Sequence, residues 1–354
     1  MNHCLTSDIR EIAAGLGEDA ARFAGRTILL CGGAGFLGRY FMSLFALLNE
    51  QALSSAPCRL IICDNLITSG KLGSEMPAQD GFRFLPHDII QPLRLEEPID
   101  YVIQAAGIAS PYYYRKYPLE TLEVATLGTK QMLALGVAHP IKGFLFFSSS
   151  EIYGDPDPQH VPTPESYRGN VSCLGPRACY DESKRLGETL CVIYHQLHGV
   201  PTKMVRPFNV YGPGMQEADY RVLPNFASRI KAGKALVIYG NGRQTRTFCY
   251  VTDAIVGFLK VLLDGAPGQV YNIGNPVPEV SMLELAKTLE RVVGRPLQVQ
   301  LMEYPDSYPA DEPQRRCPDI SKAGVQLNYR PAVDLDEGLR RFMGWTAGHY
   351  TGTP

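Results

Sequence analysis

Residues 27–38, with the sequence TILLCGGAGFLG, decide the fold. The first five are apolar apart from Thr27 and predict a buried strand, which runs directly into glycines at positions 32, 35 and 38. After them, apolar residues recur on one face of a helical segment from Leu37 to Leu48. Glycine allows a tight turn and a close approach of the backbone, and a helix N-terminus presents free N–H groups and a positive dipole end. This order of strand, glycine turn and helix predicts a site for the pyrophosphate of a dinucleotide.

Outward from this turn, short apolar runs alternate with helical stretches as far as residue 206. The predicted strands cover residues 27–31, 59–63, 82–85, 101–104, 143–148 and 202–206, and the main predicted helices cover residues 37–48, 119–135 and 177–197. Nearly all-apolar strands separated by amphipathic helices are typical of a parallel sheet covered on both faces. We therefore predict an α/β protein with a Rossmann-like, doubly wound parallel sheet.

The pattern changes after residue 206, where glycine and proline separate shorter elements. We predict a dinucleotide-binding domain at residues 25–206, and residues 247–275 return to it because residues 269–273 again have the pattern of a buried strand. Residues 207–246 and 276–346 form a smaller C-terminal, substrate-binding lobe. Residues 1–24 are expected to be a leading helix with Ser7 or Asp8 as N-cap, and residues 347–354 a frayed tail.

The composition excludes several classes of function. The chain has 354 residues, 45% hydrophobic and 20% charged, with a net charge of −2 and no basic stripe, so nucleic acid is not expected as a partner. No apolar run approaches the ~20 residues of a membrane span, so no membrane association is expected. The first 25 residues carry acidic side chains and lack the apolar core of a secretory signal. We therefore expect a cytoplasmic protein.

The cysteines and histidines do not predict a disulfide framework or a metal site. There are nine cysteines, an odd number, and none forms a CxxC pair, which favours reduced thiols. His195 and His198 are three residues apart on a predicted helix, without a carboxylate or cysteine at ligand spacing nearby. A solvated helix face is the favoured interpretation of this pair.

The second predicted strand ends at Asp64, where a carboxylate can accept a hydrogen bond from the 2′-hydroxyl of a cofactor ribose. A 2′-phosphate would be repelled there, which favours NAD over NADP. Lys71, further along the chain, could weaken this preference by supplying a positive charge.

A second group of polar residues follows the strand at residues 143–148, namely Ser148 to Glu151. Open α/β sheets bind ligands at the carboxyl ends of their strands. Tyr180 and Lys184 are four residues apart and so share one face of the following helix. An ammonium beside a phenol stabilises the phenolate, so we expect Lys184 to lower the pKa of Tyr180 and make it a general base.

Together these motifs resemble the extended short-chain dehydrogenases/reductases, the NAD-dependent epimerase/dehydratase family that acts on nucleotide sugars. Over about residues 26–345 the chain is most similar to the UDP-glucuronate decarboxylase branch. The similar segments are DNLIT at 64–68, HDI at 87–89, IASP at 108–111, SEIYGDP at 150–156, GPRACYDE at 175–182 and YGNGRQTR at 239–246. GPRACYDE is specific to this branch, whereas GGAGFLG is shared by the whole family.

The resemblance implies a role for each matching residue. The dinucleotide would be bound by Gly32, Gly35, Phe36, Leu37, Gly38, Asp64, Asn65, Asp88, Ile89 and Ala106, together with Tyr180 and Lys184. The catalytic residues would be Ser149, Ser150, Glu151, Tyr180, Lys184 and Arg316, with Ser149 paired to Tyr180 and Lys184 orienting the nicotinamide ribose. The nucleotide sugar would be bound by Asn209, Arg221, Val222, Tyr239, Arg246 and Arg316. Which of Arg315 and Arg316 faces the sugar stays open. The resemblance also implies a homodimer through the helices at about residues 119–137 and 177–197.

The residue between Ser149 and Glu151 separates the reactions of this family. A 4,6-dehydratase typically has an aspartic acid there, whereas this chain has Ser150, as the decarboxylases do. The resemblance therefore implies NAD-dependent decarboxylation of a nucleotide-linked glucuronic acid, of the UDP-glucuronate to UDP-xylose type, through a 4-keto intermediate. The alternatives are 4-epimerisation, 4,6-dehydration, or a non-catalytic protein that binds NAD or a nucleotide sugar.

Three positions depart from the family pattern, namely Gln104 in place of histidine, Pro207 and Gly214. We expect these residues to lie around the sugar or nucleotide edge of the site. They leave the base and the exact sugar open.

Overall fold

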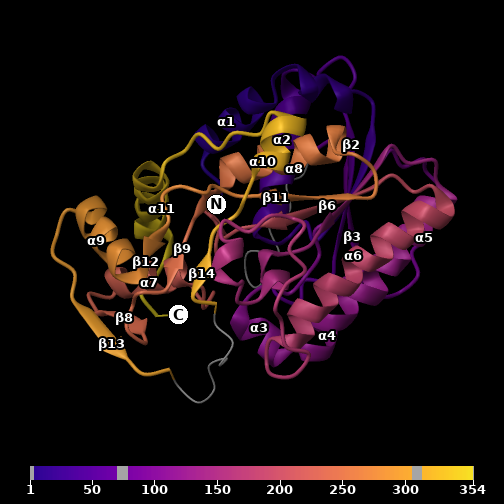
Figure 1. The fold of residues 1–354 in the computed structure, drawn as a ribbon. Helices are drawn as coiled ribbons and strands as arrows, with labels where there is room; N and C mark the ends of the chain where they lie inside the picture. Colours follow the sequence, from indigo (N-terminus) through magenta and orange to yellow (C-terminus); the bar gives the residue numbers. More distant parts are fainter. Residues whose placement is uncertain (1–3, 70–78, 305–312, 354) are drawn as a thin grey trace.

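The computed structural model describes residues 4–69, 79–304 and 313–353, and its core is a seven-stranded sheet in the order β11-β6-β5-β4-β1-β2-β3 (Figure 1). Every pairing in this sheet is parallel. The strands are β1 (Thr27–Cys31), β2 (Arg59–Asp64), β3 (Phe82–Pro86), β4 (Tyr101–Gln104), β5 (Gly143–Phe147), β6 (Thr202–Pro207) and β11 (Gln269–Ile273). The predicted fold class, a Rossmann-like doubly wound parallel sheet, is confirmed.

The sheet lies between two layers of helices, so its central strands are buried on both faces. Ile28 and Leu30 of β1 point into one apolar cluster, whereas Leu29 and Cys31 point into the other. The first cluster lies under α1 (Thr6–Leu16), α2 (Phe36–Glu50) and α8 (Val251–Asp264), and the second lies under α5 (Thr129–Ala138) and α6 (Ala178–His198). Alternation of side chains along a strand explains why one strand supplies both clusters.

The helix expected at residues 119–135 is divided into α4 (Pro118–Glu123), a π-helical segment η3 (Val124–Gly128) and α5. Three shorter elements are α3 (Pro111–Lys116), which follows β4, and the 3₁₀ turns η4 (Ser150–Tyr153) and η5 (Pro158–His160), which follow β5. Within the described residues, no helix has both the length and the apolar character needed to cross a membrane.

The second lobe lies beside the carboxyl edge of the sheet and is built from short strands and helices (Figure 1). Its small sheets pair β7 (Val210–Tyr211) with β10 (Cys249–Tyr250), β8 (Leu236–Tyr239) with β13 (Val299–Met302), and β9 (Thr245–Arg246) with β12 (Val280–Ser281) and β14 (Arg315–Arg316). Its helices are α7 (Val222–Lys231), α9 (Met282–Val293) and α11 (Leu335–His349), whereas α10 (Ser321–Leu327) packs on α8 and β11 of the large domain.

The N-cap prediction for the leading helix is wrong. Helix α1 begins at Thr6 with Leu5 as N-cap, and no side chain caps it. Asp8 is instead fully buried and accepts hydrogen bonds from the hydroxyls of Tyr250, at 2.8 Å, and Tyr40, at 3.3 Å. The carboxylate therefore connects α1 to α2 and to the end of β10. A 3₁₀ turn, η1 (Gly17–Phe23), follows the helix.

The prediction of a frayed tail is also wrong for the described residues 347–353. Helix α11 continues to His349, and Tyr350 is buried with its hydroxyl donating to the Met215 carbonyl at 2.9 Å. The backbone N–H groups of Thr351 and Gly352 donate to the Glu217 carboxylate. A carboxylate far away in the sequence therefore fixes the tail.

The close packing of the glycine turn generates a stability prediction. A Cβ on Gly38 would lie 2.6 Å from the Gly33 Cα, in contact with backbone that cannot rotate away. We expect Gly38→Ala to lower the free energy of unfolding by about 1–3 kcal/mol. Gly344, a helical glycine of α11 where an added Cβ would meet nothing within 4 Å, is the matched control. Gly344→Ala should raise stability by about 0.5–1 kcal/mol. Urea denaturation of both variants checks this, and equal effects would contradict the packing argument.

Candidate active site

The glycine turn after β1 forms the floor of the site at the carboxyl edge of the sheet. Gly32 has a φ of +81°, and a Cβ there would lie 2.7 Å from the Cα of Ala106, which follows β4. Gly35 is the N-cap of α2 and has no side chain that caps the helix. The turn therefore needs glycine for conformation and for close approach, and it leaves the first turn of α2 open to an anion.

Asp64 lies against this turn at the end of β2. Its carboxylate accepts hydrogen bonds from the N–H groups of Ala34, at 2.9 Å, and Leu66, at 2.8 Å. Burial raises the pKa of Asp64, and these two hydrogen bonds act in the opposite direction. Asn65, the next residue, donates to Asp88 at 2.9 Å. The structure thus brings the ends of β2 and β3 beside the glycine turn, whereas Lys71 lies outside the described residues.

Three of the residues expected to bind the cofactor are partly or wholly packed into the protein. Ile89 is buried, and a Cβ on Gly128 of η3 would lie 2.8 Å from its side chain. The rings of Phe36 and Tyr40 meet edge to face at 5.8 Å, and Leu37 is half-buried against the core. Because their side chains are packed against the protein, these residues would contact a ligand mainly through their backbone groups.

The structure corrects the expectation that Gln104 lies at the sugar or nucleotide edge. This side chain is fully buried, accepts from the Ala106 N–H at 3.2 Å and donates to Thr129 at 3.3 Å and to the Val124 carbonyl at 3.4 Å. It therefore ties the end of β4 to η3 and α5. Pro207 ends β6 and Gly214 has a φ of +93°, and neither lines the pocket that extends into the second lobe.

Three consecutive serines follow β5 and lead into the turn η4. Ser149 is the N-cap of this turn, and its Oγ accepts a hydrogen bond from the Glu151 N–H at 3.1 Å. Ser148, Ser149 and Ser150 are all buried. The hydroxyl of Ser149 also interacts with Tyr180, as the resemblance implied.

Tyr180 and Lys184 lie on the first turns of α6 and face this serine segment. The Lys184 ammonium donates to the Phe147 carbonyl at 2.7 Å and lies 5.7 Å from the centre of the Tyr180 ring. Its Nζ would be 3.0 Å from a Cβ on Gly107, just past Ala106. Lys184 therefore sits between the ends of β4 and β5. The Tyr180 ring stacks on Tyr114 of α3 with centroids 5.7 Å apart.

The expected lowering of the Tyr180 pKa by Lys184 is not seen. Burial raises the pKa of Tyr180, although Ser149 and the guanidiniums of Arg221 and Arg177 oppose this effect. Burial lowers the pKa of Lys184 to about 8. The reason is that both groups are enclosed, and the ammonium is bonded to a strand carbonyl instead of the phenol.

Glu151 of η4 is paired with two arginines from different elements. Arg316 of β14 forms a two-pronged ion pair with it, with one N–O distance of 2.7 Å, and Arg177, the N-cap of α6, pairs with the same carboxylate. The neighbouring Arg315 pairs with Glu279 at 2.7 Å. Successive residues of a strand point to opposite faces, so Arg316 and not Arg315 is directed toward the serine segment.

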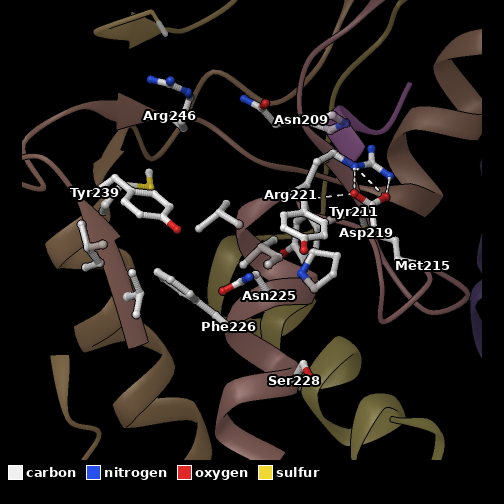
Figure 2. A pocket seen from close by; sticks show the side chains of 18 of the residues that line it. Asn209, Tyr211, Met215, Asp219, Arg221, Asn225, Phe226, Ser228, Tyr239 and Arg246 are labelled. Atoms are coloured by element: carbon white, nitrogen blue, oxygen red, sulfur yellow. Dashed lines mark hydrogen bonds and ion pairs between the residues drawn. The ribbon is translucent and has the colours of Figure 1, made fainter. Parts of the chain in front are cut away.

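A pocket of about 540 Å³ extends from Glu151 into the second lobe. All six residues expected to bind the nucleotide sugar line it, namely Asn209, Arg221, Val222, Tyr239, Arg246 and Arg316. Figure 2 shows Arg221 held by Asp219 on one side of this pocket, and Tyr239 and Arg246 on the other. The basic lining residues are Arg115, Arg177, Arg221, Arg229, Lys234, Arg246 and Arg316, whereas the acidic ones are Glu151, Glu217 and Asp219. The pocket therefore suits a polyanion.

Sequence reasoning missed several lining residues. Arg177 was not among the predicted site residues, although its position three residues before Tyr180, at the start of the same helix, is a usable signal. Tyr304, whose ring stacks on Tyr239 at 5.6 Å, and Gly352 reach the pocket from remote segments. No local pattern marks these two residues.

Residues 28–274 match the NAD dependent epimerase/dehydratase family. The chain belongs to this family. The resemblance inferred from the sequence motifs is thereby confirmed.

Two relatives within the family carry decarboxylase names. The chain is 37% identical over 313 residues to UDP-glucuronic acid decarboxylase 3 of Arabidopsis thaliana, covering 88% of this chain and 86% of that protein. It is 37% identical over 317 residues to UDP-glucuronic acid decarboxylase 1 of Xenopus tropicalis, covering 89% and 71% of the two chains.

Solved structures of the family have the same fold with different named reactions. A dTDP-glucose 4,6-dehydratase from Streptomyces venezuelae with NAD bound has a TM-score of 0.78 and 25% identity, covering 91% of this chain and 97% of that one. A UDP-glucuronic acid 4-epimerase from Bacillus cereus in complex with UDP-glucuronic acid and NAD has a TM-score of 0.75 and 26% identity, covering 92% and 100%. The fold alone therefore does not choose the reaction.

The buried carboxyl of Asp181, next to Tyr180, generates a prediction about pH. Burial raises its pKa to about 6 from an ordinary 3.8, against the lowering effects of Arg177 and Arg316. Between these values the folded protein keeps a proton that the unfolded chain has lost. The contribution of Asp181 to stability is therefore full below pH 3.8 and is lost as the pH rises through about 6.

Asparagine does not titrate, so Asp181→Asn removes this pH dependence. We expect the free energy of unfolding of Asp181→Asn, minus that of the wild type, to rise with pH from about 4 to 6 and then stay constant. Urea denaturation at several pH values measures the difference. A difference that falls or stays level over that interval would show that the folded carboxyl ionises normally.

Proposed function

We propose that this protein catalyses the NAD-dependent decarboxylation of a nucleotide-linked glucuronic acid, of the UDP-glucuronate to UDP-xylose type. The observation that carries this proposal is the segment Ser149-Ser150-Glu151, which faces Tyr180 and pairs with Arg316 at the end of a strongly basic pocket. A hydroxyl, not a carboxylic acid, stands at position 150. The decarboxylase names of relatives at 37% identity support the same conclusion.

The residues at the carboxyl edge of the sheet fit NAD. The uncapped first turn of α2, with glycine at its N-cap, suits a pyrophosphate. Asp64 lies beside it with an ionisable carboxylate, which suits a ribose hydroxyl and not an added phosphate. When bound, NAD supplies the redox chemistry by accepting a hydride from the sugar and returning it. Lys184, between the ends of β4 and β5, is placed to orient the nicotinamide ribose.

The second lobe would hold the nucleotide diphosphate. Arg221 and Arg246 offer guanidinium groups, whose planar fork of N–H donors matches phosphate oxygens. Tyr239, stacked on Tyr304, offers an aromatic surface to the base. These groups fix the nucleotide, and the pocket extends from them to Glu151, next to the serine segment that faces Tyr180.

Tyr180 acts on the hydroxyl at C4 of the sugar, from which it takes the proton as the hydroxyl is oxidised. Ser149 hydrogen-bonds at the same point and holds the sugar oxygen against the tyrosine. Since burial raises the pKa of Tyr180, its phenolate depends on these hydrogen bonds and on the positive charges of Arg177 and Arg221.

The 4-keto product is a β-keto acid, which loses carbon dioxide because the electrons of the breaking C5–C6 bond flow into the ketone. Tyr180 and Ser149 then stabilise the resulting enolate oxygen. A water next to Arg316 delivers the proton that C5 needs. Ser150 cannot supply the strong acid that would expel a C6 hydroxyl, which disfavours 4,6-dehydration.

A second candidate is 4-epimerisation of the same uronic acid. The similarity to the UDP-glucuronic acid 4-epimerase of Bacillus cereus favours it as the principal rival. It shares the proton transfer by Tyr180 and differs only after the 4-keto stage, so the two reactions are distinguished by what happens to C6. A binding protein without catalysis has little support, because Ser149, Tyr180 and Lys184 are all present and adjacent.

The deciding experiment uses UDP-glucuronic acid labelled with ¹³C at C6. Decarboxylation releases the label as carbon dioxide and leaves a pentose nucleotide, both detected by mass spectrometry. Tyr180→Phe, which removes only the hydroxyl, should lower the rate by about 10²–10⁴-fold because it lacks the general base. Label retained in a sugar of unchanged mass would instead establish the epimerase, and the Tyr180→Phe result would stand for either reaction.

We also propose that two copies associate through α4 and α6. These helices pack side by side (Figure 1) and expose a group of large apolar side chains. On α4 these are Leu119 and Leu122, and on α6 they are Leu186, Ile193 and Leu197. Leu119 is 69% exposed and Leu197 is 72% exposed, which is typical of a surface that another protein covers.

The homodimer is tested by replacing this surface. The double variant Leu122→Glu, Leu186→Glu should be monomeric by size-exclusion chromatography with light scattering, because two buried charges per copy oppose association. Val325→Glu on α10, where Val325 is 86% exposed, is the matched control and should keep the dimer. A wild-type protein that elutes as a monomer at micromolar concentration contradicts the proposal.

We propose a cytoplasmic location on the basis of the thiols. All nine cysteines fall within the described residues and all are free. Seven are buried, whereas Cys173 is exposed and Cys179 is half-buried. Free thiols in this number are typical of a reducing compartment.

A further inference from the structure

A chain of buried hydrogen bonds begins at Tyr153, two residues after Glu151 and the last residue of η4. The Tyr153 hydroxyl accepts a hydrogen bond from the Arg206 guanidinium at 2.7 Å and donates one to the side-chain oxygen of Asn272 at 2.8 Å. Tyr153 is 1% exposed and Asn272 is fully buried. Hydrogen bonds in such an enclosed place are strong, because water does not compete for either group.

The Asn272 side chain, on β11, also holds the segment that follows β14. Its amide nitrogen donates to the carbonyls of Thr163, at 2.9 Å, and Asp319, at 3.0 Å. Asp319 comes three residues after Arg316, and the Thr163 N–H donates to the Cys317 carbonyl at 2.8 Å. The amide oxygen of Asn272 therefore binds η4, and its two N–H donors bind the backbone next to Arg316.

The same chain of hydrogen bonds reaches helix α6. Arg206 of β6 forms a two-pronged ion pair with Glu188, with N–O distances of 2.8 and 2.6 Å. Glu188 is four residues after Lys184 and eight after Tyr180, so the three side chains share one face of α6. The Tyr153 hydroxyl is thus connected to the helix face that carries Tyr180.

The ion pair between Glu151 and Arg316 cannot fix its own position. Both side chains are long and rotate about several bonds, so their charged ends can meet over a range of backbone separations. Asparagine rotates about only two side-chain bonds, and Asn272 is held at three points. Asn272 therefore sets the separation of the two backbones from which Glu151 and Arg316 extend.

We propose that Tyr153 and Asn272 are positioning residues, which hold the Glu151–Arg316 pair in the place that the reaction needs after the 4-keto stage. This inference rests on the proposed function, in which a water next to Arg316 protonates C5 before the hydride returns. A displacement of about 1 Å at a reacting group can slow a step by as much as about 10²-fold.

The oxidation of C4 depends less on these two residues. Ser149 directly follows the large sheet, where the Ser148 N–H donates to the Val205 carbonyl of β6 at 2.9 Å. Tyr180 is held by α6 and stacks on Tyr114. The positions of Ser149 and Tyr180 are therefore fixed independently of the hydrogen bond between Tyr153 and Asn272.

The test follows a single turnover of UDP-glucuronic acid by protein saturated with NAD. The absorbance of NADH rises as C4 is oxidised and falls as the hydride is returned. Tyr153→Phe should slow the fall by about tenfold and change the rise by less than about twofold. This variant keeps the ring that packs on Phe208, and Arg206 keeps its ion pair and its hydrogen bond to the Glu165 carbonyl.

A second variant tests the other end of the same hydrogen bond. Asn272→Leu has a similar volume and loses all three hydrogen bonds of the amide, so it should slow the same phase. The double variant Tyr153→Phe, Asn272→Leu should be no slower than Asn272→Leu alone, because the two residues act through one connection. Additive slowing would show that they act separately, and the inference would be wrong.

Tyr271→Phe is the matched control. Tyr271 precedes Asn272 on β11, is fully buried, and its hydroxyl accepts from the Ala266 N–H at 2.9 Å and donates to Gln326 at 2.8 Å. It therefore loses as many hydrogen bonds as Tyr153→Phe on the opposite face of the strand. Urea denaturation should show a similar loss of stability in both variants, but Tyr271→Phe should change neither phase. UDP, measured by calorimetry, should bind all variants with unchanged affinity.

The remaining outcomes separate the inference from the proposed function. If Tyr153→Phe slows both phases equally, or slows neither, its hydroxyl has only a role in stability and the inference is wrong, while the proposed function stands. If the wild-type protein retains a ¹³C label at C6 of the sugar, both the inference and the proposed function are wrong.

Discussion

The parallel pairing of the central strands is the constraint on which the rest of the structure depends. When all seven strands run in one direction, their carboxyl ends must lie along one edge of the sheet. Residues far apart in the sequence are brought together at this edge by the strands that precede them. They are the glycine turn after β1, Asp64 at the end of β2, Ala106 after β4 and the serines after β5. The chemistry of the site is a consequence of strand direction.

At that edge, Glu151 joins the two lobes electrostatically. Its partners come from α6 of the large domain and from β14 of the second lobe. The ion pairs would be weak on a surface, but here the groups are enclosed, and removal of one partner leaves a buried charge without compensation. The same contacts that connect the lobes therefore also set the charge that a substrate encounters.

The sequence was most informative where local pattern and burial coincide. Strands β1 and β4 begin and end at the predicted residues because each is a short run that is buried at every position, so the local pattern ends where the strand ends. The residues expected to bind the nucleotide sugar could be named from the sequence because each lies at a position that matches the family pattern. All of them line one pocket. Asp8 shows where prediction from local sequence fails. The preference of aspartate for a helix N-cap is a local property, whereas the hydrogen bond that positions Asp8 comes from Tyr250, 242 residues away. The pKa of Tyr180 is similar, since it depends on the enclosure of the ring and not on the four-residue spacing to Lys184.

The chain passes between the lobes more than once. After β6 it enters the second lobe through β7 to β9 and returns to the large domain with α8 and β11. It then leaves again for β12, α9, β13 and β14, and packs α10 on the large domain before α11. Neither lobe is a continuous cassette, so recombination of gene segments cannot exchange one lobe and keep the other intact. A change of substrate on this scaffold must come from point substitutions in the pocket wall, which makes single positions such as those around Glu151 the natural place for new activities to arise during evolution.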